Sequence, residues 1–215
     1  GLTQTTTSEG AQENLGTNHY IDKSSAGKNG EIIGLPETAK LNFNSNLQKE
    51  TVVQNEKEDF TLSSLTKVAK KKSIYILIGS LAIKQNKPKH KFLNRSFLIN
   101  PSGSIIAKYD KLHMFDAAIS ESEEHIESAG FEAGKNAKVI STAIGKFGLS
   151  ICYDVRFPHL YRGLSQRGAQ LLTVPAAFTV PTGKAHWEIL LRARAIENGA
   201  FVIAPAQSGT HNFTG

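Results

Sequence analysis

The sequence predicts an α/β protein, and three features of the chain support this class. Apolar runs and amphipathic segments alternate along the second half of the chain, as expected where helices pack on a largely buried sheet. Residues 73–79 (SIYILIG) form a nearly continuous run of β-branched and aromatic residues, which is typical of a strand covered on both faces. Several apolar runs end in a single ionisable residue, so polar groups are expected at the strand ends.

The first third of the chain contains one predicted strand and one well-defined predicted helix. Residues 1–30 are rich in Thr, Ser, Asn and Gly, and only a weak helical layer is expected there. Residues 31–35 form a short predicted strand that Pro36 ends, so that Glu37 falls at its end. From residue 59 onward apolar side chains recur at helical spacing up to the lysine run 70–72, whose charges suit the C-terminal end of a helix.

The remaining predicted elements are hairpins followed by alternating helices and strands. In chain order they are a hairpin of residues 92–100 and 105–109, a long acidic loop at 116–134, a second hairpin of 139–144 and 149–152 around a turn at 145–148, a helix at 157–167, a strand at 170–175, a helix at 184–198 and a strand at 201–207. A loop as long as the acidic one is usually functional or disordered.

Length and composition suit a single domain over residues 1–215 with a sizeable core, since 40% of the residues are hydrophobic. The chain has one cysteine, which rules out an internal disulfide framework, and we therefore expect a cytoplasmic protein. No run reaches the roughly 18 consecutive apolar residues that a membrane span needs, and the polar start lacks the apolar core of a signal peptide. We expect no membrane association.

The formal net charge of +6 raises the question of a nucleic-acid partner. The densest basic runs, 70–72 and 87–91, are separate and contain no interleaved aromatic residues, so they are better explained as solvated lysines. We expect no nucleic-acid partner, and the excess positive charge mildly favours anionic small substrates.

Three apolar runs end in side chains that suit acyl transfer: Glu37, Lys111 and Cys152. A carboxylate, an ammonium and a thiol are the set that hydrolysis of an amide through a thioester needs. A free thiol has a pKa of about 8.5, so a neighbouring base must help it at neutral pH. Taken singly, each residue also has an ordinary explanation as a buried cysteine, a turn glutamate or a solvated lysine. Only the combination favours catalysis.

Other polar residues near these motifs are expected to be structural. His113 and His186 are predicted to be hydrogen-bonded structural groups, and the seven histidines show no ligand-like spacing, so neither a metal nor another cofactor is expected. The remaining charged residues are assigned to structural ion pairs: Asp154, Arg156, Glu188, Arg192, Arg194 and Glu197.

Four motifs occur in an order that resembles the nitrilase superfamily of carbon-nitrogen hydrolases. They are LPE at residues 35–37, KYDKLH at 108–113, GLSICYDVRF at 148–157 and GKAHWEILLRARAIEN at 183–198. The resemblance runs from about residue 31 to the end and is strongest to the branch of amidases acting on deaminated glutathione, close to the ω-amidases. It implies an α-β-β-α sandwich, usually paired as a homodimer or higher homo-oligomer. It also implies truncation at both ends, since relatives begin with a further strand and continue past the last residue.

Carried over by motif, the resemblance implies a catalytic triad of Glu37, Lys111 and Cys152. A second glutamate from the acidic loop is placed at Glu127, although the neighbouring residues Glu121, Glu123, Glu124 and Glu132 are alternatives. Substrate contacts are expected from Tyr153, through its backbone N–H, and from Phe178 and Trp187 on the pocket wall. Residues 117–119 (AAI) stand where relatives often carry Pro-Gly, which puts the shape of the substrate entrance in question.

We therefore expect a cysteine-dependent amidase that hydrolyses the terminal amide of a small carboxylate-bearing compound. Three alternatives stay open. The first is an ω-amidase acting on α-keto acid amides, and the second is a catalytically silent binding or scaffolding member of the family. The third is a cysteine–histidine hydrolase of another fold, which would depend on His113 or His186 and not on Glu37.

Overall fold

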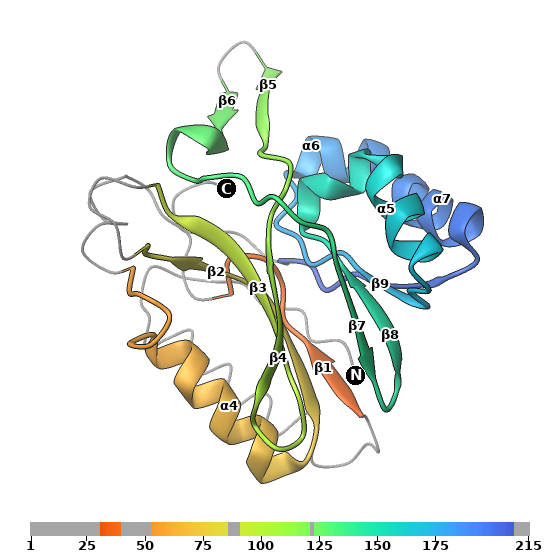
Figure 1. Cartoon of the computed structure of the whole chain (residues 1–215). Coiled ribbons are helices and arrows are strands. Elements are labelled where there is room, and N and C mark those ends of the chain that lie inside the picture. The colour runs from red at the N-terminus through yellow and green to blue at the C-terminus, as the bar shows by residue number, and fades with distance from the viewer. Residues whose placement is uncertain (1–30, 40–52, 86–90, 121–122, 209–215) are drawn as a thin grey trace.

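The computed structural model describes residues 31–39, 53–85, 91–120 and 123–208. Two four-stranded sheets face each other, and helices cover their outer faces (Figure 1). The weak helix expected within residues 1–30 and most of the basic run 87–91 lie outside the described residues.

The first sheet has the strand order β1-β2-β3-β4, with β1 parallel to β2 and the other pairs antiparallel. Its strands are β1 (Ile32–Gly34), β2 (Tyr75–Ile83), β3 (Leu93–Ile99) and β4 (Ile105–Asp110). Alternation along β2 separates two cores, because successive side chains point to opposite faces of a sheet. Ile76 and Ile78 pack on the helix side, whereas Leu77 packs between the sheets.

The second sheet has the order β10-β9-β8-β7, with β8, β9 and β10 parallel and β7 antiparallel to β8. Its strands are β7 (Lys138–Thr142), β8 (Gly145–Leu149), β9 (Leu171–Thr173) and β10 (Phe201–Ile203). The turn predicted at 145–148 was wrong and lies at residues 143–144. The Thr142 hydroxyl closes it early by donating to the Gly145 carbonyl at 2.7 Å and accepting from the Ile144 N–H at 3.2 Å.

Local sequence signals mark where two of the helices begin. α4 (Phe60–Lys72) begins after Asp59, whose carboxylate accepts from the Leu62 N–H at 2.9 Å, and ends at Ser73 in a left-handed conformation. α5 (Pro158–Gln166) has proline in its first turn. The helix expected at 184–198 begins four residues earlier than predicted. It consists of α6 (Val180–Thr182), a π-helical turn (Gly183–Trp187) and α7 (Glu188–Asn198).

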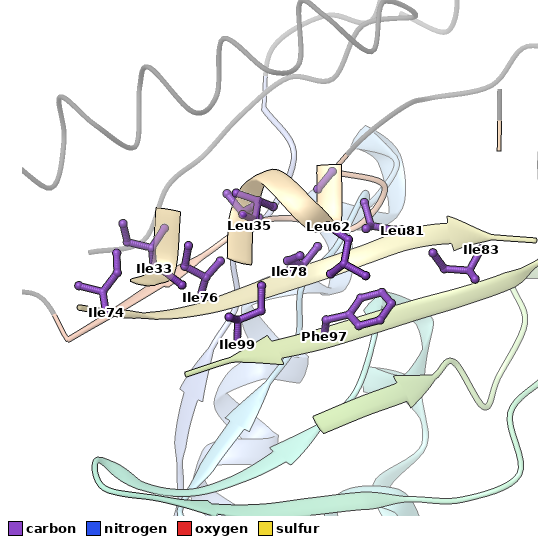
Figure 2. Packing of buried hydrophobic residues seen from close by; sticks show 13 residues of the cluster. Ile33, Leu35, Leu62, Ile74, Ile76, Ile78, Leu81, Ile83, Phe97 and Ile99 are labelled. Carbon is purple, nitrogen blue, oxygen red and sulfur yellow. The ribbon is translucent and has the colours of Figure 1, made fainter. Parts of the chain in front are cut away.

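Three apolar clusters establish the layers. The first lies between α4 and the first sheet, where Leu62 packs against Ile78 and Phe97 (Figure 2). The second lies between the two sheets and contains Leu98 and Phe147. The third joins the second sheet to α5 and α7. The α-β-β-α sandwich expected from the resemblance is therefore confirmed.

The long acidic loop was predicted wrongly in its first half. Its backbone pairs into an antiparallel hairpin of β5 (Asp116–Ser120) and β6 (Glu123–Ile126), which stands apart from both sheets (Figure 1). A 3-10 turn, Glu127–Ala129, follows it. The hairpin lacks the apolar alternation of a half-buried strand, so the sequence contained little signal for it.

Gly79 in β2 permits the close approach of the segment that carries Glu37. A Cβ atom at this position would lie 2.3 Å from both the Leu35 and Pro36 carbonyl oxygens, which are backbone atoms that cannot rotate away. We expect Gly79→Ala to lower the free energy of unfolding by about 2 kcal/mol, as overpacking does. Denaturant unfolding measures this loss. Gly163→Ala in α5 is the matched control, because its added Cβ has no atom within 4 Å and alanine favours a helix. Equal stability of the two variants would contradict the prediction.

Among the described residues, no helix is long and apolar enough to cross a membrane.

Candidate active site

The three residues at the ends of apolar runs lie on loops that leave the strands. Glu37 follows β1, Lys111 follows β4 directly, and Cys152 comes three residues after β8. Since β1 and β4 belong to the first sheet and β8 to the second, the face-to-face packing of the sheets brings these loops together.

Glu37 and Lys111 form a buried ion pair. Lys111 Nζ lies 3.0 Å from Glu37 Oε1, and the residues are 2% and 5% exposed, respectively. The other carboxylate oxygen, Oε2, accepts from the Ala177 N–H at 3.0 Å. Both oxygens of Glu37 are therefore held, so the carboxylate has a defined orientation.

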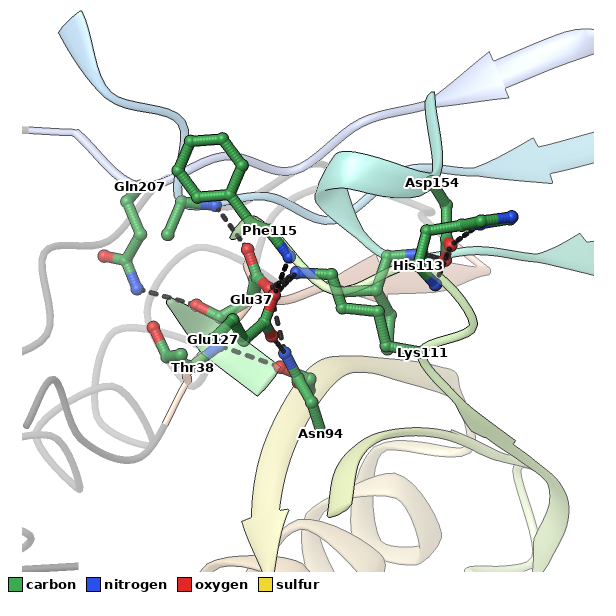
Figure 3. Close-up of polar contacts among 12 residues, drawn as sticks. Glu37, Thr38, Asn94, Lys111, His113, Phe115, Glu127, Asp154 and Gln207 are labelled. Carbon is green, nitrogen blue, oxygen red and sulfur yellow. Dashed lines mark hydrogen bonds and ion pairs between the residues drawn. The ribbon is translucent and has the colours of Figure 1, made fainter. Parts of the chain in front are cut away.

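Glu127, the loop glutamate chosen by the carry-over, is placed by the structure against this pair. Its Oε2 lies 2.8 Å from Lys111 Nζ and accepts from the Phe115 N–H at 2.7 Å. Asn94 in β3 joins the two carboxylates by donating to Glu37 Oε1 at 3.0 Å and to Glu127 Oε1 at 2.9 Å (Figure 3). Lys111 thus lies between two carboxylates in one connected network.

Sequence reasoning missed Asn94. It is 4% exposed within an otherwise largely apolar strand, where asparagine is uncommon. A buried amide at such a position needs polar partners, and that requirement was the available signal.

Cys152 opens a 3-10 turn, Cys152–Arg156, that leads into α5. Its φ of 47° lies in the left-handed region, which costs a non-glycine residue conformational energy. The Cys152 N–H donates to the Pro175 carbonyl at 2.8 Å, which helps to hold this conformation. The thiol itself is buried, and its pKa responds to the charges of Glu37 and Lys111.

Burial and the charges around it set the protonation of the site. Burial raises the pKa of the Cys152 thiol well above its usual range, and the Glu37 carboxylate raises it further, while Lys111 opposes both. Burial alone would lower the pKa of Lys111, but Glu37 and Glu127 overcome this and raise it well above its usual range. At neutral pH the site therefore holds a protonated thiol beside a charged lysine and the Glu37 carboxyl group.

Aromatic side chains surround the nucleophile turn. The rings of Tyr153 and Phe115 lie 5.1 Å apart, and those of Phe178 and Trp187 lie 4.7 Å apart. The Arg156 guanidinium lies between these pairs, 5.8 Å from the Tyr153 ring centre and 5.6 Å from that of Phe178. Of the three predicted substrate-contact residues, Tyr153 and Phe178 thus flank one cation, and Trp187 lies against Phe178.

The structural ion pairs were predicted correctly for α7 and wrongly for Arg156. Arg192 pairs with Glu188 at 3.3 Å, and Arg194 pairs with Glu197 at 2.6 Å. Arg156 has no carboxylate partner within the described part of the chain, and its polar contact is with His186 Nδ1 at 3.3 Å. Asp154 pairs with His113 and not with Arg156, because its carboxylate points inward toward β4.

No group of three or more His, Cys, Asp or Glu side chains in the described ranges could hold a metal ion.

A four-layer sandwich with buried Glu37, Lys111 and Cys152 at its strand ends is the arrangement that the four motifs indicated. The chain belongs to the carbon-nitrogen hydrolase family, whose model matches residues 4–215. The resemblance to the nitrilase superfamily is thereby confirmed.

Relatives named deaminated glutathione amidase are among the similar curated proteins. The protein from Synechocystis sp. is 43% identical over 84% of this chain and 66% of its own length, and that from Yersinia enterocolitica is 37% identical over 86% and 64%. The nitrilase and fragile histidine triad fusion protein of Caenorhabditis elegans is 41% identical over 85% of this chain and 41% of its own length. The chain thus spans less than two thirds of the length of each of these relatives.

Solved structures agree with this assignment. The C. elegans NitFhit protein matches with a TM-score of 0.89 at 35% identity, over 99% of this chain and 52% of that chain. Saccharomyces cerevisiae Nit3, described as a member of branch 10 of the nitrilase superfamily, matches with a TM-score of 0.83 at 29% identity, over 98% and 75%. An amidase from Nesterenkonia sp. AN1 matches with a TM-score of 0.80 at 25% identity, over 98% and 78%, and a mutant of it carries acrylamide at the active site cysteine.

Proposed function

We propose that this protein is a cysteine-dependent amidase that hydrolyses the terminal amide of a small carboxylate-bearing compound of the deaminated glutathione type. The observation that carries the proposal is the buried 3.0 Å ion pair of Glu37 and Lys111, whose charges both act on the buried Cys152 thiol. The names of the Synechocystis and Yersinia relatives support the substrate class.

In the first half of the proposed reaction, Glu37 takes the proton of the Cys152 thiol as the sulfur attacks the amide carbon. The C–N bond then breaks, the same proton passes to the departing nitrogen, and ammonia or an amine leaves a thioester on Cys152. In the second half, Glu37 deprotonates a water molecule that attacks the thioester. The acid product leaves and the proton returns to sulfur, so one carboxylate serves both halves.

The tetrahedral intermediates carry a negative oxygen that needs positive partners. Lys111 is charged and buried next to the thiol, and the backbone N–H of Tyr153 follows the nucleophile directly, so both are assigned to this oxygen. Glu127 positions the ammonium through its 2.8 Å contact. No step requires a metal or another cofactor.

Arg156 is assigned to the carboxylate of the substrate. Its charge has no carboxylate partner among the described side chains. The rings of Tyr153 and Phe178 flank it, and it lies four residues after the nucleophile, on the segment that begins with Cys152. A guanidinium binds a carboxylate through paired hydrogen bonds, which suits an acidic substrate.

We expect Arg156→Gln to raise KM for a carboxylate-bearing amide by about 10- to 100-fold, since a hydrogen bond to a charged group contributes about 1.5–3 kcal/mol. KM for a neutral amide such as propionamide should change little. Steady-state kinetics on both substrates measures the difference. Arg192→Gln is the control, because it removes the same charge from the exposed face of α7, where the side chain is 72% exposed. An equal change of KM for the acidic and the neutral amide would contradict the assignment.

The proposed function itself is tested by following hydrolysis of two amides by the purified protein. Deaminated glutathione should yield its dipeptide amine, and α-ketoglutaramate should yield ammonia. A strong preference for α-ketoglutaramate would favour the alternative of an ω-amidase. Hydrolysis of neither, by protein whose cysteine still alkylates, would refute the amidase and favour a binding or scaffolding role.

We also propose that the protein works in the cytoplasm as a homodimer or higher homo-oligomer. A free, buried thiol suits a reducing compartment. Large apolar side chains are exposed on and near α7, with Ile189 and Ile196 70% and 78% exposed and Phe201 78% exposed, and a second copy could cover them. Light scattering gives the molar mass in solution, and a monomer at micromolar concentration would contradict this proposal.

A further inference from the structure

Asp154 is a fully buried carboxylate that the reaction as described does not use. Four donors converge on it. Oδ1 accepts from the backbone N–H of His113 at 3.1 Å and contacts His113 Nδ1 at 2.7 Å. Oδ2 accepts from the Tyr109 hydroxyl at 2.7 Å and from the Ile151 N–H at 2.8 Å. Both oxygens are therefore fully occupied.

These donors flank the catalytic groups in the sequence. Tyr109 and His113 lie two residues before and two residues after Lys111, and Ile151 immediately precedes Cys152. Figure 3 shows Asp154 and His113 together beside the Lys111 backbone, away from the Glu37 and Glu127 carboxylates. One carboxylate thus ties the lysine loop of the first sheet to the nucleophile turn of the second.

The bonds also bear on the strained backbone of the nucleophile. The Asp154 side chain accepts from Ile151 while the Asp154 N–H donates to the Ile151 carbonyl at 3.0 Å, so the pair closes a turn around Cys152. Such a closure offsets the cost of the left-handed φ of 47°. Burial and the Asp154 charge raise the pKa of Tyr109 well above its usual range, which keeps its hydroxyl protonated as a donor.

We propose that Asp154 is a positioning residue that sets the separation between the Lys111 ammonium and the Cys152 thiol, with Tyr109 and His113 as its anchors on the lysine loop. The side chain of His113 contacts Asp154 through Nδ1 alone, and its ring is held by stacking on Phe157, with the ring centres 3.6 Å apart. The expected effect of Asp154 on turnover rests on the proposed amidase function. The expected effect on the reactivity of the Cys152 thiol does not depend on that function.

The first experiment compares two buried tyrosine hydroxyls. Tyr109→Phe removes one bond to Asp154, whereas Tyr161→Phe removes a bond to Ser150 Oγ at 2.6 Å that does not involve the Lys111 loop. Both tyrosines are buried, so similar losses of stability are expected from the two variants. We expect Tyr109→Phe to lower kcat about tenfold with KM unchanged, and Tyr161→Phe to leave kcat unchanged. A 1 Å misplacement of a catalytic group costs about 100-fold in rate. A smaller loss of kcat is expected here because Tyr109→Phe keeps three of the four bonds to Asp154.

Asp154→Asn is the stronger variant, because an amide has one acceptor oxygen and its NH₂ group would face donors. We expect a loss of kcat of about 100-fold per folded molecule, together with slower alkylation of Cys152 by iodoacetamide, since Lys111 would move away from the thiol. Equal kcat and alkylation rates in Tyr109→Phe, Tyr161→Phe and the unaltered protein would overturn the proposal, even if Asp154→Asn failed to fold.

The second experiment separates positioning by His113 from acid–base catalysis. Asparagine places an N–H close to the position of Nδ1, so His113→Asn should retain most of kcat, and His113→Leu should lose about tenfold with KM unchanged. Equal loss in both variants would overturn the assigned role of His113. The alkylation rates decide the role of Asp154 even if neither amide is hydrolysed, so failure of the proposed function and failure of this inference give different results.

Discussion

Replacement of Cys152 by alanine is expected to reduce kcat for amide hydrolysis by about 10⁶-fold, the scale of loss when a covalent nucleophile is removed from a hydrolase. The reason is that no other described side chain able to form an acyl intermediate contacts Glu37 and Lys111. Initial rates measured from released amine or ammonia give the loss, and mass spectrometry should find the acyl adduct only in the protein that retains Cys152.

Alanine is a suitable replacement because both residues carry a Cβ atom, so the left-handed backbone at position 152 costs them a similar conformational energy. Thermal unfolding should therefore be nearly unchanged. Since Cys152 is the only cysteine, iodoacetamide should add no mass to the variant. Activity within tenfold of the unaltered protein would show that hydrolysis does not pass through this sulfur.

Glu37→Gln is expected to lower kcat by about 10²–10⁴-fold, because glutamine keeps the shape of the side chain but cannot accept a proton. Glu127→Gln is the matched control. It removes the same charge from the same lysine, but Glu127 is not among the main causes of the raised pKa of Cys152. A smaller loss of kcat is expected there, since Lys111 keeps its pair with Glu37. Equal losses would contradict the assignment of Glu37 as the base.

The same pair of variants has a pH signature. Burial first and Glu37 second raise the pKa of Cys152, so alkylation of the unaltered protein should continue to rise above about pH 8.5, the value for a free thiol. Removal of the Glu37 charge takes away one of the raising effects, and the alkylation profile of Glu37→Gln should move to lower pH. The profile of Glu127→Gln should stay closer to that of the unaltered protein. A shift of the Glu37→Gln profile to higher pH would contradict the electrostatic description of the site.

Local patterns predicted the positions that carry the site. Pro36 ends the first apolar run before Glu37, and Lys111 directly follows β4, so both residues were expected at strand ends and lie there. The helix α4 was predicted closely because Asp59 caps it and lysines end it. These features depend on neighbours within a few residues, which the sequence displays directly.

Other features could not be read from local patterns. The β5–β6 hairpin forms by backbone pairing in a segment whose sequence lacks apolar alternation, and Arg156 was assigned to an ion pair that the structure does not form. Asn94 was missed because its partners, Glu37 and Glu127, lie 57 and 33 residues away in the chain. Each depends on the direction in which a side chain points once distant segments are packed.

By itself the sequence determined the layered α/β class, the family and the three strand-end residues, since hydrophobic periodicity and motif spacing are local properties of a chain. Only the tertiary structure decided that Glu37 meets Lys111 across 74 residues and the Ala177 N–H across 140. It also decided that Glu127 and no other described acidic side chain completes the lysine site, and that Asp154 faces the lysine loop. The physical reason is that these contacts form only when the two sheets pack face to face. Burial between the sheets then strengthens the electrostatic interactions among the charged groups.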